Sequence, residues 1–220
     1  MPEGPPDRKP SLVIVAGASG QHAAVVYEAA LLSGIPVAGF AAIARNAPAA
    51  VLDCPPLGQL DACTVEGRSF VIACGSNTLR RELTERLRQR GACFAAVVHP
   101  AAIVSPSATI DPGAVVLAGA IIGPRATIGE GVIVNHAAVV DHDCRLEAFA
   151  NICPGVRLAG CVTVRAGAFV GINAAVIQGI EVGHDSIVGA GAAVIRDVTA
   201  ESIVGGVPAK LLSRDNTTPK

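Results

Sequence analysis

The chain has 220 residues, of which 51% are hydrophobic but only 3% aromatic, so its core must consist largely of small aliphatic side chains. This length suits one or two domains. The 17 basic and 18 acidic residues nearly cancel, and no Lys/Arg run is interleaved with aromatic residues, which argues against a nucleic-acid partner. No apolar run reaches the roughly 18 residues of a membrane span, and the polar residues 1–10 do not resemble a signal peptide. We therefore expect a cytoplasmic protein without a membrane span.

Residues 11–99 alternate between predicted strands and helices. SLVIVAG, IPVAGF and SFVIACG have the composition of buried strands, whereas HAAVVYEAALLSG and residues 78–91 are predicted helices. This order indicates a small parallel sheet in an α/β, Rossmann-like domain of residues 1–99. We interpret the mixed charges of residues 80–90 as a solvated helix face.

The turn after the first predicted strand, GASGQH at residues 17–22, is a candidate anion site. Gly17 and Gly20 stand where the backbone turns sharply into a helix N-terminus, which favours an anion. The turn lacks the complete G-x-G-x-x-G pattern, so a tight turn without a ligand is the alternative.

From residue 100 onward the period of the sequence changes to six. Every sixth residue from Val104 to Val194 is a branched aliphatic, at all 16 positions, and the residue two places earlier is usually small. This periodicity is a signature of a parallel β-helix, in which each hexad forms one flat side and its corner. We expect such a prism, of the left-handed kind, over residues 100–205, followed by a C-terminal tail at 206–220. With 18 residues per coil and roughly 4.8 Å per coil, its length is on the order of 25 Å.

The seven cysteines are scattered and include no CxxC pair. They are better explained as reduced thiols in the core than as disulfides or metal ligands. We therefore expect no metal.

Several motifs resemble the left-handed β-helix acyltransferases of the hexapeptide-repeat family. GASGQHAAVVYEAA and IACGSNTLRREL resemble the N-terminal signatures of bacterial nucleotide-sugar N-acetyltransferases, and VVHPAAIVSPSATI resembles their junction with the prism. NHAAVVDHDCRLEAFANICPGVRLAGCV resembles their active-site coils, and GGVPAKLL their C-terminal ending. The resemblance covers residues 11–212. It implies acetyl-CoA-dependent acetylation of the 4-amino group of a UDP- or GDP-linked amino-deoxysugar, as in the bacillosamine-pathway and perosamine enzymes.

His142 is the candidate general base, because acyl transfer to an amine requires a group that accepts a proton near pH 7. It stands two residues after the core residue Val140, so it should point outward, and Asp143 is placed to orient its imidazole. Gly160 lies one coil of 18 residues further on, where its amide N–H is a candidate donor to the thioester oxygen. The resemblance implies the same three roles.

Further candidate site residues come from the glycine turn, from the outward phase of Asn135 and His136 one hexad before His142, and from the resemblance. The nucleotide and sugar are expected to contact Gly17, Ser19, Gly20, Asn77, Arg80, Asn135, His136 and Asn151. Coenzyme A is expected beside Gly160, Ile172, Gly189 and Ala190, with Arg196 and Lys210 near its phosphates. The chain has GFAAIARN where many relatives carry an acidic pair, so UDP and GDP remain open.

Other interpretations remain open as well. O-acetylation of a sialic acid, a non-catalytic sugar-binding scaffold and a carbonic-anhydrase-like zinc enzyme are the alternatives, although the third histidine of the zinc enzyme is not evident. His184 shares the outward phase of His142 and is interpreted as a surface residue. The resemblance also implies a homotrimer with active sites between subunits, and the outward aliphatics Ile121, Ile133 and Ile172 are compatible with subunit contacts.

Overall fold

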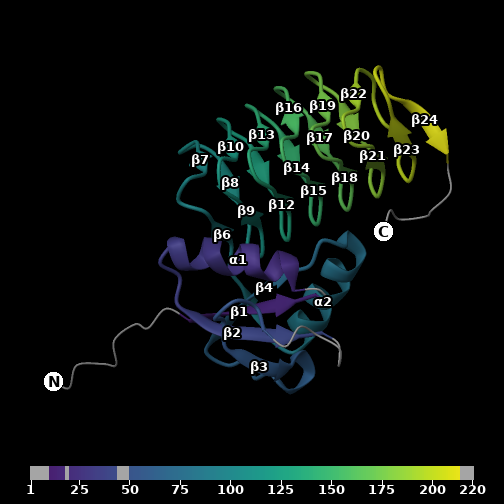
Figure 1. The fold of residues 1–220 in the computed structure, drawn as a ribbon. Coiled ribbons are helices and arrows are strands. Elements are labelled where there is room, and N and C mark those ends of the chain that lie inside the picture. The colour runs from purple at the N-terminus through teal and green to yellow at the C-terminus, as the bar shows by residue number, and fades with distance from the viewer. Residues whose placement is uncertain (1–9, 18–19, 44–49, 214–220) are drawn as a thin grey trace.

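The computed structural model describes residues 10–17, 20–43 and 50–213, which form an α/β domain docked against a β-helical prism (Figure 1). The sheet of the first domain is parallel, with the strand order β3-β2-β1-β4-β5. Its elements are β1 (Ser11–Ala16), α1 (Gln21–Leu32), β2 (Val37–Ala42), β3 (Pro56–Gln59), the 3-10 helix η1 (Leu60–Ala62), β4 (Arg68–Ala73), α2 (Asn77–Gln89) and β5 (Cys93–Phe94). The three predicted strands and both predicted helices are present, while β3, η1 and β5 lie in segments without a clear period.

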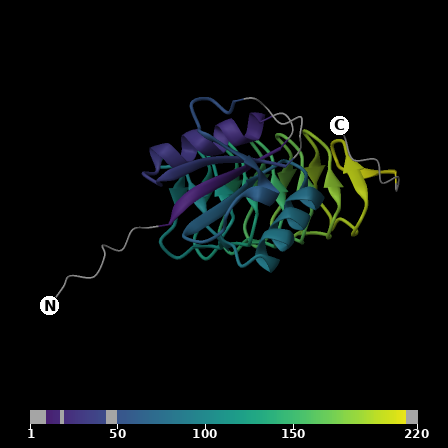
Figure 2. The same ribbon diagram turned by 90° about the horizontal axis from the view of Figure 1, so that it is seen from below.

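The two helices cover opposite faces of this sheet. Leu12 and Ile14 of β1 face α1, and the alternate residue Val13 packs with Leu83 and Leu87 of α2. The alternation follows from the period of two along a strand. Both helices also contact the prism: α1 packs against it, and side chains of α2 donate hydrogen bonds to its carbonyls (Figures 1 and 2).

The prism has three faces, each a stack of short parallel strands. Face 1 contains β6 (Val97–Val98), β9 (Val115–Val116), β12 (Ile133–Val134), β15 (Asn151–Ile152), β18 (Phe169–Val170), β21 (Ile187–Val188), β23 (Ile203–Gly205) and the antiparallel β24 (Lys210–Ser213). Face 2 contains β7 (Ile103–Val104), β10 (Ile121–Ile122), β13 (Val139–Val140), β16 (Arg157–Leu158), β19 (Ala175–Val176) and β22 (Ala193–Val194). Face 3 contains β8 (Thr109–Ile110), β11 (Thr127–Ile128), β14 (Arg145–Leu146), β17 (Thr163–Val164) and β20 (Glu181–Val182).

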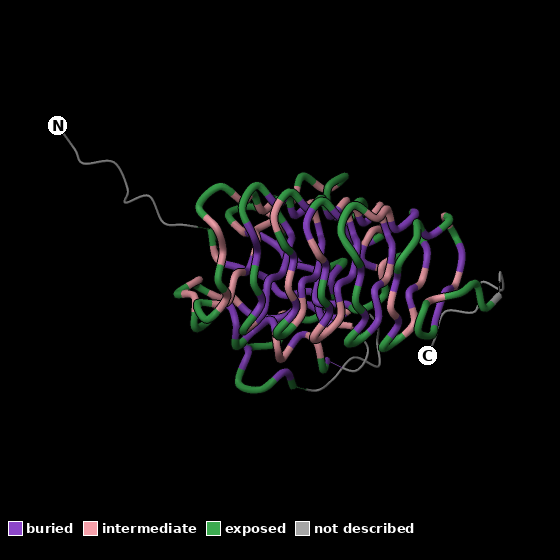
Figure 3. The backbone as a smooth tube through the Cα atoms, turned by 90° about the horizontal axis from the view of Figure 1, so that it is seen from above, coloured by how far each residue is buried: buried purple, intermediate pink, exposed green. Residues whose placement is uncertain are grey.

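The sixteen periodic aliphatics form the continuous core of the prism. Each is the second residue of its strand, and strands 18 residues apart are paired, as in Ile122 with Val140. All are buried except Val104 and Ile110, which are partly exposed at the N-terminal end of the stack. Figure 3 shows buried strands along the prism and exposed corners between them. Burial of one such side chain contributes about 1.5–3 kcal/mol, so the repeat accounts for most of the stability of a fold with few aromatics.

Each corner turns at a residue in the left-handed region. A positive φ recurs at every sixth residue from Gly113 to Gly191. Seven of these residues are not glycine: Arg125, Ala137, Asp143, Phe149, Cys161, Asn173 and Asp185. This left-handed corner position fixes the backbone at Arg125, Asp143 and Cys161, which follow one another in three successive coils.

The first domain covers part of face 1. Val97, Val115 and Ile133 point outward from this face and are buried in a cluster with residues of α1. Ile133 is therefore covered within the same chain, which corrects the expectation that it is free for subunit contacts.

The two ends of the prism extend beyond the expected range. Its first strand begins at Val97, before residue 100, and β24 lies in the segment expected to be a tail. Within the described ranges, no helix is long and apolar enough to cross a bilayer.

Candidate active site

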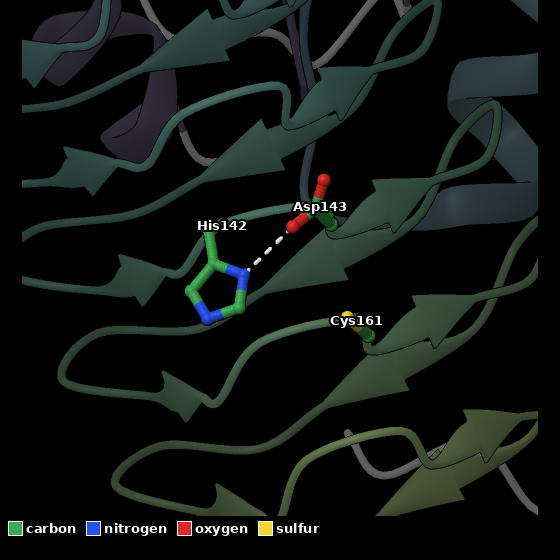
Figure 4. A group of neighbouring side chains, drawn as sticks. All are labelled: His142, Asp143 and Cys161. Carbon is green, nitrogen blue, oxygen red and sulfur yellow. Dashed lines mark hydrogen bonds and ion pairs between the residues drawn. The ribbon is translucent and has the colours of Figure 1, made fainter.

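His142 projects from the corner between faces 2 and 3, directly after β13. Its Nδ1 atom lies 2.8 Å from Oδ2 of Asp143, and about two fifths of its side chain is exposed (Figure 4). Asp143 stands at the left-handed corner position with φ 58°. Aspartate tolerates this conformation better than most residues, so the corner can carry a carboxylate beside the imidazole.

Arg125 holds Asp143 in place from the preceding coil. Its Nε and NH2 donate to the two carboxylate oxygens at 2.6 and 2.8 Å. The guanidinium, together with the hydrogen bond to His142, lowers the pKa of Asp143 well below its usual range. Asp143 is therefore an anion at every physiological pH, and an anion at Nδ1 favours the tautomer in which Nε2 is free to accept a proton.

Gly160 lies under the other edge of the imidazole. A methyl group built on Gly160 would stand 2.5 Å from Nε2 of His142, so only glycine leaves room for the ring in this orientation. Among the hydrogen bonds of the described residues, the Gly160 amide donates none. The predicted pair of His142 and Gly160 is thus brought together, with an amide N–H available beside the imidazole.

Asp141, for which no role was predicted, stabilises the corner turn that carries His142. Its Oδ1 accepts a hydrogen bond from the His142 amide at 2.7 Å. Below it, a methyl group on Gly123 would come within 2.7 Å of the His142 backbone nitrogen. The backbone that carries the imidazole is therefore supported from its own coil and from the preceding one.

The glycine turn of the first domain lies at the carboxyl ends of β1 and β4. Gly20 has φ 66° and begins α1, and its amide donates to the Gly17 carbonyl at 3.1 Å. Gly17 lies beside Cys74 at the end of β4. The strand order changes direction between β1 and β4, and ligands of open parallel sheets bind outside the strand ends at such a point. Ser19 lies outside the described residues.

Arg80 stabilises the contact between the two domains. It is only 1% exposed, and it donates to the carbonyls of Cys74, Gly131 and Phe149 at 2.9, 2.7 and 2.7 Å. Burial lowers its pKa to about 10, so it remains charged near neutral pH. This geometry does not support the expected contact of Arg80 with a nucleotide, and it also corrects the expectation that every charge in residues 80–90 is solvated.

Asn77 and Asn151 also connect the two domains. The amide of Asn77 donates to the Gly167 carbonyl at 2.7 Å, and that of Asn151 donates to the Gly75 carbonyl at 3.1 Å. Asn151 is 5% exposed, and its Oδ1 has no hydrogen-bond partner among the described residues. Both side chains therefore contribute hydrogen bonds to the contact between the two domains.

His22 is a half-buried titratable residue that is not among the predicted site residues. Its Nε2 is buried without a hydrogen-bond partner in the described part of the chain. Burial, followed by the charges of Arg80 and His136, lowers its pKa to about 4. The signal in the sequence is its place in GASGQHAAVVYEAA, the stretch that resembles the N-terminal signature of nucleotide-sugar N-acetyltransferases.

The expected sugar and coenzyme residues lie on two different corners. Asn135 and His136 lie between faces 1 and 2, as do Ile172, Gly189 and Ala190 of later coils. Gly160 and Arg196 share the corner of His142, between faces 2 and 3, and Lys210 begins β24. All of the coenzyme candidates are at least partly exposed except Gly160, which the imidazole covers.

A cleft of about 520 Å³ opens where the first domain ends on face 1. Its floor continues the outward row of this face with Phe169, Ile187 and Ile203, and the start of α2 forms its wall. Arg81 reaches from that wall to Asp185 at 3.1 Å.

Comparisons with known proteins agree with this architecture. The family described as bacterial transferase hexapeptide (six repeats) matches residues 101–136. A search of curated proteins gave no match.

Three solved structures resemble the chain over nearly its whole length. PerB from Caulobacter crescentus, in complex with CoA and GDP-perosamine, is 40% identical with a TM-score of 0.86, and the match covers 92% of this chain and 97% of that one. A variant of GDP-perosamine N-acetyltransferase from the same organism is 39% identical, with a TM-score of 0.87 and the same coverage. The acetyltransferase domain of PglB from Neisseria gonorrhoeae, in complex with acetyl coenzyme A, is 34% identical with a TM-score of 0.86, over 93% of this chain and 100% of that one.

These identities and coverages place the chain in a family. Its strands form the left-handed parallel β-helix of that family, as the hexad period predicts. The chain belongs to the β-helix sugar N-acetyltransferases of the hexapeptide-repeat family, and it is an acyltransferase.

Proposed function

We propose that the protein transfers an acetyl group from acetyl-CoA to the 4-amino group of a nucleotide-linked amino-deoxysugar. The observation that carries this proposal is the His142 imidazole, held by Asp143 at one nitrogen and seated over Gly160 at the other. Membership in the sugar N-acetyltransferase family supports the same reaction, and a relative at 40% identity is in complex with CoA and GDP-perosamine.

The reaction is direct attack of the amine on the thioester. As the C–N bond forms, Nε2 of His142 takes the proton that the nitrogen loses, and the resulting imidazolium is stabilised by Asp143. The Gly160 amide donates to the oxyanion, a contact typically worth about 3–4 kcal/mol in such transition states. The C–S bond then breaks, and CoA leaves as a thiolate that needs little assistance.

The first domain is, in this proposal, a Rossmann-like nucleotide-binding domain. The diphosphate lies over Gly17 and Gly20 at the ends of β1 and β4, and the nucleotide extends toward the cleft beside α2. Three features support this placement: the switch in strand order, the N-terminus of α1 and the open volume next to Arg81. GDP-perosamine is the first substrate to test, because a relative binds it.

The active site is proposed to form between subunits of a trimer. His136 and the glycine turn lie toward one edge of face 2, whereas His142 lies at its other edge, so a sugar held at the first edge is remote from the base of its own chain. A neighbouring copy would bring its His142 corner to the sugar. Coenzyme A would then lie in the groove between the two prisms and contact Ile172, Gly189 and Ala190 by their backbone.

The test is release of free CoA thiol from acetyl-CoA with GDP- and UDP-linked 4-amino sugars, beside matched sugars that carry a hydroxyl instead of the amine. We expect turnover with an amino sugar only, and loss of at least about 100-fold in His142→Asn. His184→Asn is the matched control, because His184 also precedes an aspartate on an exposed corner, but the residue one coil later is Ser202 and not a glycine. Equal thiol release by the wild type and His142→Asn would refute the assignment of the base, and turnover of the hydroxy sugar would favour O-acetylation.

A further inference from the structure

A thiol lies beside the His142–Asp143 pair. Cys161 is exposed and occupies the left-handed corner position one coil after Asp143 (Figure 4). One ligand atom from each of His142, Asp143 and Cys161 lies within 4.8 Å of the others. Over residues 10–17, 20–43 and 50–213, this is the one group of three or more His, Cys, Asp or Glu side chains that converges in this way.

We propose that these three side chains form an inhibitory binding site for a divalent cation of the zinc class. The inhibition rests on the proposed function of His142 as the base, whereas binding of the cation does not. The site is distinct from a resident metal centre, because acyl transfer as described above requires no metal.

The donor set fits zinc better than the hard cations. Imidazole nitrogen, carboxylate oxygen and thiolate sulfur are the three ligand types that Zn²⁺ takes in proteins, whereas Mg²⁺ and Ca²⁺ prefer oxygen alone. Three protein ligands leave the fourth position of a tetrahedral zinc ion to water. The thiol proton goes to the buffer as the sulfur–metal bond forms.

The geometry needs only a small adjustment. Tetrahedral zinc with bonds of about 2.0–2.3 Å separates its ligand atoms by roughly 3.3–3.8 Å, so the widest pair must approach by about 1 Å. The backbone on which two of the ligands stand is fixed, since the Asp143 amide donates to Pro124 and the Cys161 amide donates to His142, both at 2.9 Å. The exposed thiol can therefore turn toward the metal while the corner stays in place.

Arg125 competes with the cation for the Asp143 carboxylate, but it can also hold that carboxylate in place. It occupies both oxygens of Asp143, at 2.6 and 2.8 Å. The cation must take Oδ2, which also faces Nδ1 of His142, while Oδ1 keeps its bond to Arg125 Nε. A ligating carboxylate with an outer hydrogen-bond partner is the usual arrangement at metal sites.

Binding at this place would remove the base. Nδ1 is the imidazole nitrogen that faces Asp143, so the cation would take the place of the proton on Nδ1, and that proton would move to Nε2. A neutral imidazole whose Nδ1 lone pair is bound to a metal carries its proton on Nε2, and that nitrogen can no longer accept a proton from the amine. Inhibition would therefore not require the cation to block the substrate.

The experiment titrates the full-length protein with zinc chloride by calorimetry and with cobalt(II) chloride by absorption. Cys161→Ser removes the thiolate, and Cys161→Asn is a second variant suited to the left-handed backbone. Cys93→Ser is the matched control, because Cys93 is the other exposed cysteine in the described part of the chain. Thiol release is measured in parallel over a range of zinc concentrations, and each variant is compared with its own rate without metal.

We expect one zinc ion per chain, and a thiolate-to-cobalt charge-transfer band in the wild type and Cys93→Ser that is absent from both Cys161 variants. The zinc dissociation constant and the half-inhibitory concentration should both rise at least about tenfold when Cys161 is replaced, and a chelator should restore the activity. Equal zinc affinity of the wild type and Cys161→Ser, or cobalt binding without the charge-transfer band, would overturn the site. If the protein binds zinc as expected but acetylates no amino sugar, the proposed function fails while the metal site stands.

Discussion

The contact between Gly160 and His142 gives a sharp prediction for Gly160→Ala. The new methyl group would stand 2.5 Å from Nε2, whereas ordinary contacts begin near 3.4 Å, so the imidazole must retreat by about 1 Å. Gly160 has no positive φ, and alanine fits its backbone without strain. The whole effect should therefore fall on the ring. A displacement of about 1 Å at a catalytic group can cost roughly 100-fold in rate, which corresponds to about 2.7 kcal/mol of barrier.

The assay is kcat/KM for acetyl transfer, combined with the free energy of unfolding in denaturant. We expect Gly160→Ala to lose about 100-fold in kcat/KM but less than about 0.5 kcal/mol of stability, because an exposed side chain can move aside. Gly123→Ala is the contrasting variant. Its methyl group would meet the His142 backbone nitrogen at 2.7 Å, and the backbone cannot give way so easily, so about 1–3 kcal/mol of stability should be lost.

A double-mutant cycle decides whether the effect passes through the imidazole. In a His142→Ala background the methyl group has no ring to displace, and Gly160→Ala should then change the remaining rate by less than about twofold. A loss of about 100-fold in that background as well would refute the reasoning. It would mean that Gly160 acts on the acetyl group independently of the histidine.

Three further predictions concern charges around the site. Arg80→Met should lower the free energy of unfolding by about 3–5 kcal/mol, because it leaves several buried carbonyls without their donor, whereas the exposed Arg86→Ala should cost less than about 1 kcal/mol; chemical denaturation measures both. The lowered pKa of His22 means that the unfolded chain binds a proton below about pH 6.5 and the folded chain only near pH 4. The stability of the wild type should therefore fall by up to about 3 kcal/mol more than that of His22→Gln as pH drops from 6.5 to 4, and equal pH profiles would contradict this. Arg125→Gln removes the cation that lowers the pKa of Asp143, so this pKa should rise toward its usual value, which NMR of the carboxyl group can follow. In the pH profile of kcat, the acidic limb should then move to higher pH.

The prism could be predicted because its information is local and repeated. Each hexad carries its own aliphatic residue, and 18 residues per coil fix which hexads are stacked. The outward phase of His142 follows from the same count, as does its place beside Gly160. The periodic core therefore made it possible to predict both the fold and the pairing of the base with the glycine.

The role of Arg80 could not be predicted in this way. The two residues that follow it, Arg81 and Glu82, are charged and at least partly exposed, and the pattern of residues 80–90 is that of an amphipathic helix on a surface. The acceptors of Arg80 at Gly131 and Phe149 are 51 and 69 residues away in the sequence. They are corner carbonyls whose orientation depends on the left-handed turns, and no property of their side chains marks them as partners of an arginine.

The two-corner arrangement connects the fold with the chemistry. A hexad separates the corner of His136 from that of His142, which corresponds to at most roughly 20 Å of extended chain. The glycine turn lies on the side of the first corner, because α1 docks on face 1 and its second residue, His22, is close enough to His136 for an electrostatic interaction. One chain thus presents the glycine turn, the proposed nucleotide site, at one edge of face 2 and His142, the proposed base, at the other. The proposed reaction in the groove between two copies would bring the glycine turn of one copy to the His142 corner of the next, and it would cover a corner that is exposed in a single chain.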